Sequence, residues 1–294
     1  MVVDANCLFR LYSLLHLTQL YLRPYPAAEV TQNLLMMAPW FKNRDPFLVV
    51  GPEGCGKGAL LDYCFKRIMG VQVAVVNCSA QTSAANVVQK LVQVCGKPVT
   101  TTSGKALRPP DNTRVILYLK DLNLPRPDKY NTCQLISFLQ QLIAHHGYYD
   151  ENLDFIRVER VQIVGSMTPP GSVGRHALST RFTALVRIVT MGYPDRENLA
   201  TIYTNMAQRV LANSKTASSV SPAALSKAML EVYSSVRERF TPNDYPHYEF
   251  NARELSDWIN GIQRYSLEGG LTLVQVRVVC VQHGKAGLCA ARQL

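Results

Sequence analysis

A glycine-rich loop between an apolar run and an amphipathic segment most constrains what this chain can fold into. The loop reads Gly51-Pro-Glu-Gly-Cys-Gly-Lys57 and fits the first seven positions of the phosphate-loop pattern Gly-x-x-x-x-Gly-Lys-Ser/Thr. Residues 46–50 ahead of it are typical of a buried strand, and residues 57–69 behind it carry apolar side chains at helical spacing. Because this pattern is meaningful only between a strand and a helix, its context predicts a P-loop nucleotide-binding fold.

Each part of the loop has an expected role in holding phosphate. Its glycines let the backbone curl so that N–H groups point inward, where the positive end of the following helix dipole adds to them. Lys57 can reach the outer phosphates of a nucleotide, whereas Gly58 departs from the pattern because it has no hydroxyl to hold magnesium. A glycine-rich turn without a ligand is the alternative. The expected binding residues are Gly51, Pro52, Glu53, Gly54, Cys55, Gly56, Lys57 and Gly58.

The remaining pattern predicts an α/β fold followed by a helical region. Near-continuous apolar strands that alternate with amphipathic helices indicate a five-stranded parallel sheet between helices. From Pro194 onward the strand patterns stop, and three helical patterns predict a small all-helical subdomain. Strands are predicted at 46–50, 71–76, 115–119, 161–165 and 185–189, and helices at 57–69, 83–94, 133–145, 195–212, 222–240 and 251–265.

Composition and charge narrow the classes of protein that fit. With 47% hydrophobic and 18% charged residues, the chain is typical of a folded globular protein and not of a disordered, collagen-like or coiled-coil one. A net charge of +10 is compatible with a nucleic-acid partner, but the basic residues are scattered without a stripe, which argues against one. No apolar run is long enough to span a membrane and no secretory signal is recognised, so we expect an intracellular protein.

The cysteines and histidines predict no metal site. The eight cysteines show no Cys-x-x-Cys pair and no zinc-finger spacing, so we expect buried thiols rather than disulfides or zinc ligands. His145 and His146 lie near a predicted helix end, where adjacent side chains point about 100° apart and suit a helix cap better than a metal. Trp40 is expected either to line an adenine pocket or to pack in the core.

The strand at 115–119 should be followed by the residues that hold metal and activate water. A P-loop ATPase normally places an Asp there and, in many families, a Glu after it. This strand is instead followed by Lys120-Asp121, so the expected pair of acids is absent. The sequence therefore predicts nucleotide binding with very slow hydrolysis, and it puts magnesium binding in doubt.

Further motifs follow one another along the chain: Lys120-Asp-Leu-Asn-Leu-Pro125, Asp128-Lys-Tyr130, Gly147-Tyr-Tyr-Asp150, 161–170, 178–182, Tyr193-Pro194, Arg239-Phe-Thr241 and His247-Tyr248. In this order they resemble the landmarks of a dynein heavy-chain AAA+ module, most closely the third module of the ring in the dyneins of retrograde intraflagellar transport. The resemblance covers about residues 28–270. It implies a large α/β nucleotide-binding subdomain at 28–193 and a helical lid at 194–270. It leaves 1–27 as an N-terminal extension and 271–294 as a tail, neither of which it explains.

The resemblance also implies roles around the phosphate loop. Lys57 becomes the phosphate lysine, Lys120 occupies the position of the metal-binding Asp, and Asp121 occupies that of the catalytic Glu. In the alternative register, one residue later, Asp121 is the metal ligand and Leu122 replaces the Glu. The run Asn123-Leu-Pro125 favours the first register.

Three more positions match residues that act on the nucleotide in such modules. Thr168 stands at the sensor 1 position and can offer a hydroxyl to a water or a phosphate. Arg181 matches the arginine finger, which in this family reaches the nucleotide of the neighbouring module. Arg253 matches the sensor 2 arginine that closes the lid over the phosphates. For each arginine, a solvated surface charge is the alternative.

The function implied by the resemblance is that of a regulatory module in a microtubule motor, binding ATP or ADP with little hydrolysis of its own. Expected partners are the adjacent AAA+ modules, other dynein subunits and, only through the full-length motor, the microtubule. We expect no stalk or cargo tail in this chain, no nucleic-acid or membrane partner, and a location in cytoplasm, cytoskeleton and cilium. The alternatives are a stand-alone AAA+ ATPase acting on nucleic acid or another polymer, against which Gly58 and Lys120 argue, and a purely structural module with an empty site.

Overall fold

The computed structural model describes residues 28–101, 104–110, 113–172, 174–212, 221–241, 243–245, 248 and 250–262. The chain divides into two compact units. One, the α/β unit, is Gln32–Gly192, and the other, the helical unit, contains residues 28–31 and the described residues from Tyr193 onward. The extension at 1–27 and the tail at 271–294 lie outside the described residues.

The five predicted strands form one parallel sheet, which confirms the predicted fold class. The first of the predicted strands lies inside the sheet, between the fourth and the fifth of them. Since parallel strands end at a common edge, the loops after the first, third and fourth predicted strands meet at the carboxyl edge of this sheet. In spatial order the strands are β2 (Val71–Asn77), β5 (Arg114–Lys120), β8 (Val161–Met167), β1 (Phe47–Val50) and β9 (Arg187–Thr190).

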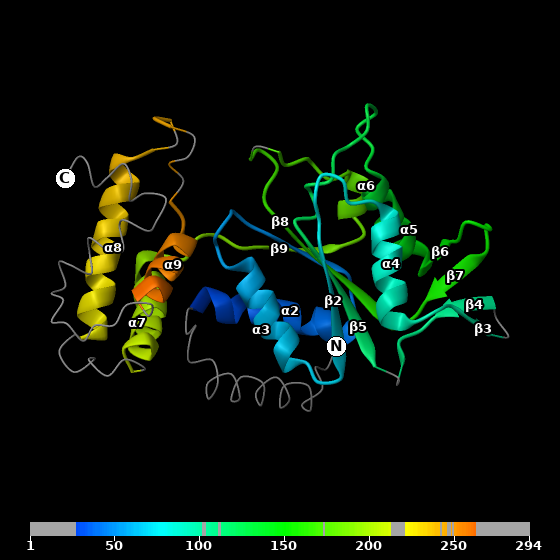
Figure 1. Ribbon diagram of the computed structural model, residues 1–294, viewed down its shortest axis with the longest axis horizontal. Helices are drawn as coiled ribbons and strands as arrows, with labels where there is room; N and C mark the ends of the chain where they lie inside the picture. The colour runs from blue at the N-terminus through cyan, green and yellow to red at the C-terminus, as the bar shows by residue number, and fades with distance from the viewer. Residues whose placement is uncertain are drawn as a thin grey trace, which may run out of the picture. The chain divides into compact units, whose positions relative to one another are not determined.

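Helices cover both faces of this sheet (Figure 1). Along β5 the side chains alternate. Leu117 packs in the cluster formed with α4 (Ala84–Cys95) and α5 (Gln134–His145), while Tyr118 faces the other side and packs on Phe65 of α3 (Lys57–Arg67), with ring centroids 5.3 Å apart. Phe41 of α2 packs on the same face against Phe65. The helices are α2 (Ala28–Asn43), α3 (Lys57–Arg67), α4 (Ala84–Cys95) and α5 (Gln134–His145).

A second, four-stranded sheet and the helix α2 were not predicted. The second sheet joins the segment after α4 to the connection between α5 and β8. Its strands have only three or four residues, which is too short for an apolar period to show. Helix α2 contains Pro39, which in an isolated sequence argues against a helix. The strands are β3 (Val99–Thr101), β4 (Gly104–Leu107), β7 (Phe155–Val158) and β6 (Gly147–Tyr149), in that spatial order, and a short helix α6 (Thr180–Thr183) precedes β9.

The helical unit consists of α7 (Arg196–Ala212), α8 (Pro222–Arg239) and α9 (Ala252–Ile262), close to the three predicted helices. The side chains of Tyr203, Met229 and Leu255, one from each helix, meet in its core. The hydroxyl of Tyr203 also donates a hydrogen bond to the main-chain oxygen of Ala252 and so fixes the start of α9. Among the helices in the described part of the chain, none is both long and apolar enough to cross a membrane.

Candidate functional site

The glycine-rich loop lies where β1 passes into α3, at the carboxyl edge of the sheet. A side chain at position 51 would collide with the main-chain oxygen of Met191, just beyond β9, so only glycine fits there. Gly56, with φ of 97°, adopts the left-handed conformation and is the N-cap of α3. Because Gly56 has no side chain, nothing caps the first turn of α3, and its N–H groups are oriented toward the loop where an anion would bind.

Lys57, the first residue of α3, is folded back onto the loop. Its Nζ donates hydrogen bonds to the main-chain oxygens of Gly51 at 2.6 Å and Pro52 at 2.7 Å, and lies 3.8 Å from Sγ of Cys55. The ammonium group is therefore held at the mouth of the curled backbone. A curled glycine-rich backbone, a cation and an uncapped helix start together fit the phosphates of a nucleotide.

Lys120 lies beside the place where a P-loop protein holds magnesium. A methyl group added at Gly58 would contact Cε of Lys120 at 3.7 Å. In the usual arrangement, a hydroxyl at the position of Gly58 and a carboxylate at the end of this strand coordinate the ion. Here the first position has no side chain and the second carries a positive charge, so the pair does not fit magnesium. The proximity also favours the register in which Lys120 stands at the metal-ligand position.

Arg175 links the glycine-rich loop to the residue after β5. Its Nη2 donates to Oε1 of Glu53 at 2.7 Å, and its Nη1 lies 3.1 Å from Oδ1 of Asp121, in an ion pair without an aligned N–H. The side chain of Arg175 is 12% exposed, whereas those of Asp121 and Glu53 are 38% and 48% exposed. The carboxylate at the predicted catalytic position is thus already paired with a cation. Arg175 was missed because it lies in a loop between the recognised motifs, and no sequence pattern marks it.

We expect Arg175 and Glu53 to be energetically coupled. Either single change, Arg175→Met or Glu53→Gln, already breaks their ion pair. The double variant should therefore lose about 0.5–1 kcal/mol less unfolding free energy of the α/β unit than the sum of the two single losses. Urea unfolding measures this in a Trp258→Phe background, where Trp40 alone reports on the α/β unit. The control combines Arg126→Met, at an exposed position, with Glu53→Gln, and there the losses of unfolding free energy should be additive. Additivity within about 0.3 kcal/mol for the Arg175 pair would contradict the bridge.

Asn123 and Thr168 fasten the segment after β5 to the end of β8. Their exposed fractions are 2% and 3%, and Nδ2 of Asn123 donates to the main-chain oxygen of Thr168 at 2.7 Å. The N–H of Leu122 donates to the oxygen of Ser166, and the side chain of Leu122 is buried in the core. The role of Asn123 was not predicted, although its motif was used to set the register. The sensor 1 role of Thr168 stays a prediction.

The two arginines predicted to act on nucleotide lie in different units. Arg181 is exposed on α6, where Oγ of Ser179 accepts from the N–H of Phe182 and caps the helix. Arg253 is exposed in the first turn of α9, and its N–H donates to Oδ1 of Asn251 at 3.0 Å. Solvent-accessible positions are compatible with both predicted roles, which stay predictions.

The remaining candidates have structural roles. The ring of Trp40 packs on Phe47 of β1 with centroids 5.5 Å apart, which favours the core role over an adenine pocket. His146 caps the end of α5, as predicted. Burial raises the pKa of the thiols of Cys64 and Cys78 to about 12, so both are unreactive, and the described cysteines form no disulfide. Within the described ranges, no group of three or more His, Cys, Asp or Glu side chains is placed to hold a metal ion.

Comparison with known families accounts for most of the chain. Residues 24–194, more than half of the sequence, match the family model described as the P-loop containing dynein motor region. The chain belongs to the dynein heavy-chain family. Residues 206–283 of this dynein module match the dynein heavy chain ATPase lid domain, so its helical unit corresponds to the lid. This assignment does not support the alternative of a stand-alone ATPase acting on nucleic acid.

Individual dynein heavy chains are similar to this module over most of its length. It is 46% identical over 248 residues to cytoplasmic dynein 2 heavy chain 1 of Tripneustes gratilla and 45% identical over 249 residues to that of Homo sapiens. It is 31% identical over 239 residues to the cytoplasmic dynein heavy chain of Caenorhabditis elegans. The matches cover 82%, 82% and 81% of the module but only 6%, 6% and 5% of the relatives' lengths. The dynein resemblance found in the sequence is confirmed.

Proposed function

We propose that this dynein module binds ATP or ADP, hydrolyses it very slowly, and uses its occupancy to regulate neighbouring modules. The observation that carries the proposal is an intact phosphate loop with Lys120 packed beside Gly58. Lys57 and the curled backbone supply what binding requires, whereas the side chains that would hold magnesium are replaced. Binding is thereby separated from hydrolysis at this site.

In the full motor, we propose that the module stands third in the ring and serves retrograde intraflagellar transport. The similarity to cytoplasmic dynein 2 heavy chains supports this role. Arg181 then acts on the nucleotide of the adjacent module, and Arg253 closes the lid over its own. The partners are the other modules of the same heavy chain, further dynein subunits and, through the whole motor, the microtubule, in the cytoplasm, the cytoskeleton and the cilium.

The direct test is to identify the nucleotide that the purified protein carries. Denatured protein should release ATP or ADP in a ratio of about one per chain, measured by mass spectrometry, and the Lys57→Ala variant should release much less. Protein that carries no nucleotide and binds none when titrated would instead be a purely structural module with an empty site.

Steady ATP turnover by the isolated module should be far slower than that of an ordinary enzyme. Asp121 is one methylene shorter than the Glu that orients water, and it is paired with Arg175. A misplacement of about 1 Å can lower a rate by about a hundred-fold. We therefore expect phosphate release well below about 1 s⁻¹. A rate of about 1 s⁻¹ or faster that disappears in the Lys57→Ala variant would show that the site is catalytically competent.

A further inference from the structure

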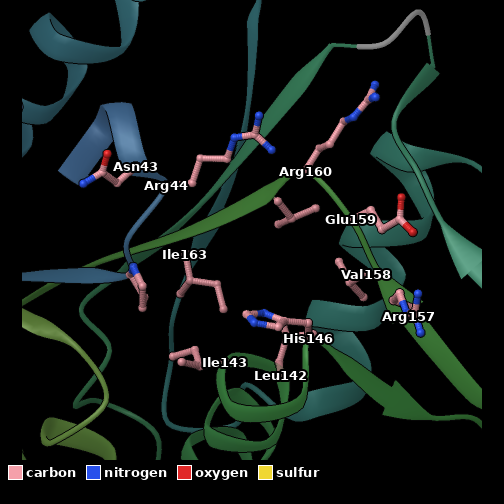
Figure 2. Close-up of a pocket in the computed structure, with 12 residues that line it drawn as sticks. Asn43, Arg44, Leu142, Ile143, His146, Arg157, Val158, Glu159, Arg160 and Ile163 are labelled. Atoms are coloured by element: carbon pink, nitrogen blue, oxygen red, sulfur yellow. The ribbon is translucent and has the colours of Figure 1, made fainter. Parts of the chain in front are cut away.

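A second pocket lies at the amino edge of the parallel sheet, at the opposite end of the strands from the glycine-rich loop. It has a volume of about 530 Å³, within the range of pockets that bind ligands. Three segments form it: the turn between α2 and β1, the end of α5, and the connection from β7 to β8. Figure 2 shows its aliphatic floor, with the ring of His146 turned toward it. The floor consists of Pro46, Leu142, Ile143, Val158, Val161 and Ile163.

The rim of this pocket is strongly cationic. Arg44, Arg157 and Arg160 line it, and none of the three forms an ion pair with any residue of the described ranges. The one acid, Glu159, is bound by two hydrogen bonds from Arg108, at 2.8 and 3.2 Å, which lower its pKa below the ordinary value, as do the charges of Arg157 and Arg160. Glu159 therefore stays ionised and is already paired with Arg108, while the three arginines that line the pocket outnumber its one carboxylate.

Three of the residues that line the pocket occupy positions where the backbone favours glycine. Arg44, His146 and Arg160 have φ of 62°, 53° and 60°, in the left-handed region that side chains disfavour. They account for half of the non-glycine residues with positive φ in the described chain, and all three line this pocket. Strained residues of this kind cluster at functional sites. His146 caps the end of α5, and a cation after the end of α2 is favourable, which explains Arg44. Neither reason applies to Arg160, because Arg160 follows a strand.

The arrangement of the charges indicates the shape of the ligand. Figure 2 shows the guanidinium groups of Arg44 and Arg160 on one side of the pocket and that of Arg157 on another, so they do not converge on one point as a single phosphate would require. The aliphatic floor between them suits an apolar side chain. We propose that this pocket docks a segment of a partner protein in which acidic residues flank an apolar one. The acidic side chains of the segment would pair with the arginines of the rim, and its apolar side chain would be buried against the floor.

Fluorescence anisotropy with the full chain and a labelled hexapeptide of alternating glutamate and leucine tests the proposal. The double variant Arg44→Gly, Arg160→Gly removes two charges at positions where glycine relieves strain, so its thermal midpoint should be equal to or above that of the wild type. Its affinity for the peptide should be lower by about fivefold or more. The control Lys97→Ala, Arg126→Ala loses two exposed charges away from the pocket and should bind as the wild type does.

The choice of probes separates the acidic segment from other ligands. Peptides of alternating lysine and leucine, or of glutamate and serine, should bind more weakly, because they lack the charge or the apolar groups. The proposal is overturned if the glutamate–leucine peptide does not bind, if it binds the glycine variant equally, or if the lysine–leucine peptide binds as well. Pocket-dependent binding of a short DNA duplex in preference to the peptide would also overturn it. None of these measurements requires nucleotide, so the outcome is independent of the phosphate loop.

Discussion

Replacing Lys57 by alanine should lower the affinity of the module for ATP by about ten- to a hundred-fold. A hydrogen bond to a charged group contributes about 1.5–3 kcal/mol, which corresponds to that change in the dissociation constant. The lower end of the range is expected, because Lys57 must give up its two hydrogen bonds to Gly51 and Pro52 before it reaches a phosphate. Isothermal titration calorimetry with ATP measures the effect.

Lys66→Ala is the matched control for this prediction. Lys66 lies in the last turn of the same helix, α3, whereas Lys57 lies in the first, so the control removes the same charge at a distance from the loop. It should change the affinity for ATP by less than about twofold, since an exposed charge at that distance is largely screened. Equal affinity in the wild type and the Lys57→Ala variant would refute phosphate binding by this loop.

Removing magnesium with EDTA should leave the nucleotide affinity of the wild type almost unchanged. The side chain of Lys120 lies with its Cε beside Gly58, close to where the ion would normally sit, and a lysine and a divalent cation in one place repel each other. We expect Lys120 to neutralise phosphate charge in place of the ion. A P-loop site that has both metal ligands should lose nucleotide affinity when EDTA is added, because there the ion bridges the protein and the phosphates.

Two substitutions at this position distinguish charge from coordination. Lys120→Asp restores the carboxylate and should make affinity depend on magnesium by about tenfold or more. Lys120→Met removes the positive charge without supplying a ligand, so its affinity should fall both with and without the ion. A wild-type protein that loses its nucleotide when EDTA is added would show that magnesium, and not Lys120, holds the phosphates.

The large sheet was predictable because its inner strands, β5, β8 and β1, are mostly buried on both faces. Five residues in a row of β5, from Val115 to Leu119, are buried, and such a run is visible in the sequence without any knowledge of contacts. The glycine-rich loop was predictable for a related reason, since its residues are adjacent in the chain and one motif contains them all. Residues of the loop that are neighbours in the sequence are also neighbours in the structure.

The bridge made by Arg175 was not predictable, because its partners are far away in the sequence. Glu53 precedes it by 122 residues, and only the closure of the sheet brings the two side chains within hydrogen-bonding distance. The second pocket has the same property, because Arg44 and Arg160 line it together although they are far apart in the sequence. The second sheet escaped prediction since its three- and four-residue strands carry no clear period.

The position of β1 has a consequence for how the protein is made. Although β1 precedes the other four strands of the sheet in sequence, Phe47 pairs with Val164 on one side and Arg187 on the other. A ribosome that adds about 5–20 residues per second needs on the order of 6–20 s to produce the roughly 110 residues between β1 and β8. During this interval the apolar β1 has no strand to pair with on either edge, which makes it a natural target for chaperones. The phosphate loop is translated before four of the five strands, yet the sheet around it is completed only after β8 and β9 have been made.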